Sequence, residues 1–167
     1  MSKLFALSQE REQQVRDVIE KTTLGTYGLT FKIMGSPKVK GLVKVSKANP
    51  VTEYLEGEQD IITIIIHEEV FDKMEADGSS KEITEIQNMI IENALSTIEV
   101  DTEKDKVSVK QNVIATNTGM LAKYGYEKAV RALELGELTS AMIEKEEADR
   151  KAAEKEAKAQ KKNKNNF

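Results

Sequence analysis

Cysteine is absent from this chain of 167 residues, and histidine occurs once, at His67. Without thiols the chain cannot form disulfides, thiolate zinc sites or iron–sulfur clusters, and it has no cysteine nucleophile. One imidazole also excludes any site that needs two or three. No apolar run approaches the roughly 18 residues of a membrane span, and residues 1–7 are too short for a signal-peptide core. We therefore expect an intracellular protein with no membrane partner and no cofactor.

Charged residues are plentiful, at 32% of the chain, but they are unevenly placed. Residues 1–50 carry nine basic and four acidic side chains, residues 51–147 carry nine and 22, and residues 148–167 carry seven and three. Such segregation creates surface fields that steer partners. The acidic middle has two interpretations. It keeps the protein soluble and repels nucleic acid, or it occupies the nucleic-acid groove of a partner as a mimic.

The strands are predicted from alternating or continuous apolar residues. The strongest element is Ile61–Ile66, six consecutive β-branched residues that disfavour helix and are typical of a central strand buried on both faces. Alternation predicts further strands at 29–33, 38–45 and 106–110. Asn49-Pro50 indicates a loop.

The helices are predicted from apolar residues three and four positions apart. One helix follows Ser8, a typical N-cap residue, and another runs from Ser80 to about Ile98, with an acidic turn after it. A short helix covers 118–124, and the last begins near Tyr126. Its predicted buried stripe is Val130, Leu133, Leu138, Ala141 and Met142.

These elements predict an α+β fold: a small mixed sheet of about four strands, packed by two to three helices and followed by a long C-terminal helix with a charged tail. Residues 1–146 would form a single domain and residues 147–167 a charged, partly disordered helical tail. Because periodicity does not distinguish a core from an interface, the last helix could also form a homo-oligomer through Leu133, Leu138 and Met142.

Lysines on the second predicted strand are the clearest binding feature. Lys38, Lys40 and Lys44 would share one face of an extended segment, with Lys32 and Lys47 flanking them. A row of lysines attracts phosphates with little regard to sequence, but it also protects an edge strand from aggregation. The basic tail, with the same two interpretations of nucleic-acid contact or a solvated helix, contributes Lys158, Lys161, Lys162 and Lys164.

One cluster has residue types that ligate metals, namely His67, Glu68, Glu69 and Asp72. A hydrolytic zinc site usually has three protein ligands, commonly including two histidines. One imidazole with carboxylates is a poor zinc set, and the acidic residues also suit the first turn of a helix. The interpretation of the chain as a metal-dependent hydrolase therefore depends on this cluster alone, and we expect no bound metal.

The order of elements over residues 38–126 resembles that of phage-type zinc metallopeptidases with a minimal zincin-like domain. The likeness comprises a lysine-rich strand, the apolar strand Asp60–Ile66, the helix ending in residues 90–101, an acidic turn, a strand, and the pair Tyr124-Gly125. In that family the helix carries histidine, glutamate and histidine at i, i+1 and i+4. Here those positions are Asn93, Ala94 and Thr97, and the third ligand falls near Asn112.

The resemblance implies an inactive relative, because every ligand and the general base are replaced. No catalytic residue is carried over. We expect a non-catalytic interaction protein with a protein partner, phage-encoded and located in the bacterial cytoplasm or the virion. The alternatives are a nucleic-acid-binding protein that uses the lysines of residues 38–47 and the basic tail, or a metal-dependent hydrolase.

Overall fold

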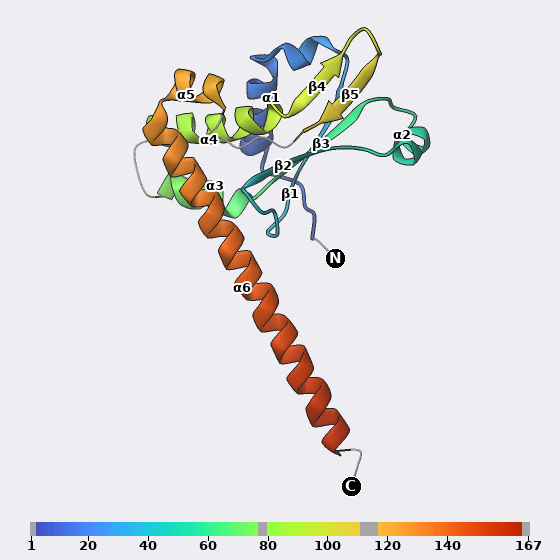
Figure 1. Cartoon of the computed structure of the whole chain (residues 1–167), viewed down its shortest axis with the longest axis vertical. Helices are drawn as coiled ribbons and strands as arrows, with labels where there is room; N and C mark the ends of the chain where they lie inside the picture. Colours follow the sequence, from blue (N-terminus) through green and yellow to red (C-terminus); the bar gives the residue numbers. More distant parts are fainter. Residues whose placement is uncertain (1–2, 77–79, 111–116, 165–167) are drawn as a thin grey trace.

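The computed structural model describes residues 3–76, 80–110 and 117–164 (Figure 1). The predicted α+β fold is confirmed. The elements are, in chain order, α1 (Gln9–Glu20), the 3₁₀ turn η1 (Thr23–Thr26), β1 (Thr30–Gly35), β2 (Val43–Lys47), α2 (Pro50–Glu56), β3 (Ile61–Ile66), α3 (Glu68–Ala76), α4 (Ser80–Leu95), β4 (Ile98–Asp101), β5 (Lys106–Val109), α5 (Thr118–Tyr124) and α6 (Tyr126–Lys164).

Strand β3 is the centre of a three-stranded mixed sheet, as its β-branched run predicts. It pairs parallel with β1 on one side and antiparallel with β2 on the other. Ile62, Ile64 and Ile66 on one of its faces are completely buried and join a core built largely from α1 and α4. Each such side chain contributes roughly 1.5–3 kcal/mol of burial free energy. The opposite face, which carries Thr63 and Ile65, is half-buried.

The expected single sheet of about four strands is instead a sheet of three and a separate hairpin. The helix predicted to reach Ile98 ends at Leu95, and Ile98–Asp101 pairs antiparallel with Lys106–Val109. The chain turns out of the helix at Thr97, whose carbonyl accepts from the Lys110 N–H at 2.8 Å. The β-branched residues after Leu95 favour this pairing over another helical turn. The acidic turn therefore joins two strands, not a helix and a strand.

The predicted strand over 38–45 is wrong in its first half, because β2 begins at Val43. Gly41 and Leu42 both have positive φ, 75° and 74°, so the chain reverses there and cannot continue an extended strand. Lys38 and Lys40 therefore lie in the loop between β1 and β2, and the predicted row with Lys44 does not form. Helix α6 packs against this loop at Gly136, where an added Cβ would lie 3.7 Å from the Gly41 Cα, at van der Waals contact.

Asn49-Pro50, predicted as a loop, starts helix α2. The Asn49 side chain accepts from the Thr52 N–H at 2.8 Å, and proline occupies the first helical position. Gly57 ends the helix at φ 67°. Because α2 buries none of its residues, apolar periodicity gave no signal for it.

Helix α6 packs through only part of the predicted stripe: Leu133 lies half-buried against the core, whereas Ala141 is exposed. Leu138 and Met142 are 61% and 53% exposed. Small residues at the contact surface bring α6 close to its neighbours, and the acidic side chains of α4 bind its basic ones. Glu85 and Glu82 pair with Lys128 and Arg131. The buried positions of α6 are Ala129, Ala132, Thr139 and Ile143.

Beyond its docked part, α6 continues unbroken past Glu146 and extends from the rest of the molecule as a rod (Figure 1). Its 39 residues span about 58 Å at the usual rise of an α-helix. None of the helices in the described ranges combines the length and the hydropathy that crossing a lipid bilayer requires.

Candidate functional site

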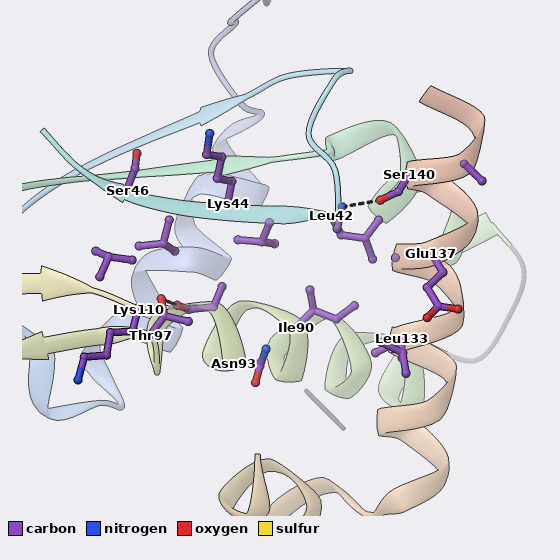
Figure 2. Close-up of a pocket in the computed structure, with 18 of the residues that line it drawn as sticks. Leu42, Lys44, Ser46, Ile90, Asn93, Thr97, Lys110, Leu133, Glu137 and Ser140 are labelled. Carbon is purple, nitrogen blue, oxygen red and sulfur yellow. Dashed lines mark hydrogen bonds between the residues drawn. The ribbon is translucent and has the colours of Figure 1, made fainter. Parts of the chain in front are cut away.

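A groove of about 920 Å³ runs along strand β2, and four elements from distant parts of the sequence form it (Figure 2). Strand β2 is one side, the C-terminal half of α4 is the floor, the end of β5 closes one end and α6 closes the other. The size is typical of a ligand-binding cleft. The side chains that define its interior include Val43, Val45, Ile90, Asn93, Ala94, Thr97, Val109, Leu133, Glu137 and Ser140.

Half of the main-chain groups of β2 face away from the sheet. The strand pairs antiparallel with β3. Next to its two ends, the Ala48 N–H donates to the Ile61 carbonyl and the His67 main-chain N–H donates to the Leu42 carbonyl, both at 2.9 Å, so the even-numbered residues bond toward β3. Residues of an antiparallel pair alternate between bonding inward and facing outward. The N–H groups of Val45 and Lys47 and the C=O groups of Val43, Val45 and Lys47 therefore point outward. No strand in the described residues pairs with them.

The groove floor contains three of the four positions that the resemblance compares with zinc ligands and a general base. Asn93, Ala94 and Thr97 all line it, and Asn112 lies outside the described residues. The Asn93 Oδ1 accepts from the Asn117 Nδ2 at 3.0 Å, and the amide nitrogen is the end of the group nearer to β2 (Figure 2). Thr97 lies beyond the end of α4, and its hydroxyl donates to the Ala94 carbonyl at 2.6 Å.

The floor consequently has hydrogen-bonding groups but no strong base. Asn and Thr are poor zinc ligands, and Ala94 cannot accept a proton from water. Among the described residues, no three His, Asp or Glu side chains converge on one point where a metal could bind.

The α6 wall is fastened to the β1–β2 loop. The Gly41 N–H donates to the Ser140 Oγ at 3.1 Å, and the Lys40 Nζ lies 3.1 Å from a Glu144 carboxylate oxygen. Glu137 lies one turn before Ser140 on the same wall (Figure 2). No ion pair joins Glu137 to another residue in the part of the chain that the structure describes. It is thus a carboxylate at the groove that is open to an incoming cation.

The predicted lysine contacts are dispersed, not gathered on one face. Lys32 pairs with Glu56, and Lys47 lies 3.3 Å from Asp60. Lys44 extends from the side of β2 away from the groove floor (Figure 2). Lys38 is half-buried in the loop. On α6, Lys158 and Lys161 are exposed, and the side chains of Lys162 and Lys164 lie outside the described part of the structure.

His67 does not belong to the groove floor. It is 6% exposed just after β3, where its main-chain N–H donates to the Leu42 carbonyl at 2.9 Å. Its Nδ1 is buried without a hydrogen-bond partner in the described residues. Of the acidic residues grouped with it in sequence, Glu68 instead accepts from the Ser8 hydroxyl and Asp72 from Arg11. The side chains of this sequence cluster therefore do not converge on His67.

A second cleft, of about 800 Å³, lies between α1, α3 and α4 around the buried Arg11. Arg11 is 5% exposed, and its Nη2 lies 3.0 Å from Asp72 and 2.8 Å from Glu75. Its guanidinium also stacks on the Phe71 ring, 5.1 Å from the centroid. Sequence inspection missed this cluster because an arginine in an ordinary helix gives no local signal. Its contacts tie α1 to α3, which is a structural role.

The resolved pKa shifts arise from contacts between or within helices, and none belongs to a residue that lines the groove. Burial and the hydrogen bond to Glu92 raise the pKa of Tyr124. Lys128 lowers the pKa of Glu85, and Lys73 lowers that of Glu69.

Comparisons with protein-family models, with curated proteins and with solved structures gave no match, so what the chain does is inferred from its own residues.

Proposed function

We propose that this chain is a non-catalytic binding protein that captures an extended segment of a partner protein by adding it as a strand to β2. The observation that carries the proposal is the outward row of main-chain N–H and C=O groups on β2, placed beside a groove of ligand size. Strand addition uses such groups for affinity and side-chain pockets for specificity.

The two edges of the sheet differ in a way that supports this use of β2. At the β1 edge, the Phe5 N–H donates to the Gly35 carbonyl at 3.0 Å, and the Gly35 N–H donates to the Phe5 carbonyl at 2.8 Å. The N-terminal segment therefore covers part of that edge. The five residues of β2 span about 17 Å, which accommodates a short extended segment.

The composition of the floor supports binding without catalysis. Ile90, Ala94 and Leu133 offer apolar contact, and Asn93 offers an amide donor. In this proposal the chain is an inactive relative built on a metallopeptidase-like scaffold, as the resemblance implies. The phage origin and the location in the host cytoplasm or the virion, which the resemblance implies, belong to this proposal.

A screen of displayed random peptides against the full chain tests the proposal. Ala94→Phe fills the groove floor, and Ala122→Phe is the matched control, because Ala122 is exposed on α5 outside the groove. We expect enriched peptides to bind the unmodified chain and Ala122→Phe but not Ala94→Phe. Peptides that bind all three chains equally, or a screen with no enrichment, would contradict the proposal.

A further inference from the structure

We propose, on the basis of strand addition to β2, that the groove selects an extended segment with an apolar side chain followed two residues later by a lysine or arginine. The apolar side chain lies opposite Val45, and the basic one lies opposite Val43 and pairs with Glu137. The segment runs antiparallel to β2, the arrangement that β2 already makes with β3 and the slightly more stable one.

The apolar preference follows from the face on which Val45 lies. Val45 is in register with Ile64, which is completely buried on the side of the sheet that packs on the helices. Residues directly opposite one another in a sheet project from the same face. A side chain opposite Val45 therefore projects toward the floor at Ile90 and Ala94, where an apolar group removes both surfaces from water.

The preference for a basic residue follows from the α6 wall. The β2 end at Val43 adjoins Gly41, which is held to Ser140 of α6 by a 3.1 Å hydrogen bond. Alternate side chains of a strand share one face, so the residue opposite Val43 also projects toward the helices, at the α6 end. Gly136 there has no side chain to obstruct a long aliphatic stem.

Glu137 is the carboxylate on this wall that a basic side chain can neutralise. The other wall carboxylate, Glu144, is already 3.1 Å from the Lys40 Nζ. Glu137 has no such partner among the described residues. An acidic side chain at the same ligand position would face Glu137 with like charge, which disfavours the wrong segment as well as favouring the right one.

The probe is the peptide acetyl-Thr-Thr-Val-Thr-Lys-Thr-amide, titrated to millimolar concentration while the amide signals of Val45 and Lys47 are followed by NMR. Three matched peptides accompany it: one with glutamate in place of lysine, one with the sequence reversed, and one N-methylated at the valine amide. In the antiparallel arrangement the valine N–H donates to the Val45 carbonyl, so N-methylation removes a bond that strand addition needs.

We expect the lysine peptide to bind the unmodified chain more tightly than the glutamate and reversed peptides. Glu137→Lys should lower the affinity for the lysine peptide at least about threefold and raise the affinity for the glutamate peptide. Glu134→Lys is the matched charge control, because Glu134 is exposed on α6 outside the groove, and it should preserve the original preference.

The outcomes separate this inference from the proposed function. Equal binding of the lysine and glutamate peptides, with loss on N-methylation, overturns the charge selection and leaves strand addition intact. Tighter binding of the reversed peptide overturns the antiparallel direction. If the N-methylated peptide binds as well as its parent, or if no peptide binds, strand addition fails and the inference fails with it.

Discussion

Replacing Tyr124 with phenylalanine tests how α5 is held against α4. The Tyr124 hydroxyl donates to the Glu92 Oε2 at 2.5 Å, and the Glu92 side chain is only 17% exposed. A hydrogen bond to a charged group contributes more than a neutral one, and partial exposure reduces its effect. We expect Tyr124→Phe to lower the free energy of unfolding by about 1–2 kcal/mol, or about 2–8 °C in Tm.

The same bond makes the effect depend on pH. Burial and the bond to Glu92 raise the native pKa of Tyr124 above its ordinary value of 10.0, so the native state holds this proton more tightly than the unfolded chain does. The stabilisation is therefore complete below about pH 10 and is lost as the pH rises toward the native pKa. The stability difference between the unmodified chain and Tyr124→Phe should shrink above pH 10.

Urea unfolding, followed by circular dichroism at neutral pH and above pH 10, measures both effects. Tyr54→Phe is the control, because Tyr54 is 85% exposed and its loss should leave stability unchanged. The account of Tyr124 is refuted if Tyr124→Phe unfolds like the Tyr54→Phe control, or if its deficit does not change with pH.

Three further changes test the core, the buried arginine and a helix cap, each by urea unfolding. Ile64→Ala removes a completely buried side chain and should cost about 2–5 kcal/mol, so a loss below about 1 kcal/mol would contradict the central place of β3. Arg11→Met keeps apolar packing on Phe71 but removes the ion pairs and should cost about 1–3 kcal/mol; equal stability would show that these pairs are screened. Asn49→Ala removes the bond to Thr52 and should cost about 1 kcal/mol, with faster amide exchange confined to α2; unchanged exchange there would show that the cap is dispensable.

The sequence predicted elements well where local chemistry and tertiary packing agree. Ile61–Ile66 forms the central strand because β-branched side chains favour strands and one face of the sheet buries Ile62, Ile64 and Ile66 completely. The predicted burial of both faces is only partly met, because Thr63 and Ile65 on the other face are half-buried. Helix α1 begins after Ser8, whose side chain accepts from the Arg11 N–H, and it buries the predicted Val15.

The errors arose where tertiary contacts decide the structure. Leu42 adopts φ 74°, which leucine does not favour by itself. No local sequence rule therefore predicted that β2 would begin only after Leu42. Helix α6 packs through Ala129 and Ala132, whereas periodicity weights large side chains such as Leu138.

The candidate site was predicted only in part, for a related reason. Asn93, Ala94 and Thr97 were identified through the family resemblance, and the structure places all three at the groove. Glu137 and Ser140 were missed because they reach the groove from α6, at least 40 residues farther along the chain. Neither residue lies in a pattern that marks a site, and the docking of α6 on α4 and on the β1–β2 loop brings them there.

Amide hydrogen exchange along β2, measured by NMR, tests the central claim most directly. The N–H groups of Lys44, Ser46 and Ala48 face β3 and should be protected, whereas those of Val45 and Lys47 face outward and should exchange rapidly. A peptide selected for binding should then protect Val45 and Lys47. Uniform protection along the strand in the free protein would show that the edge is already occupied, and a bound peptide that leaves Val45 and Lys47 unprotected would contradict strand addition.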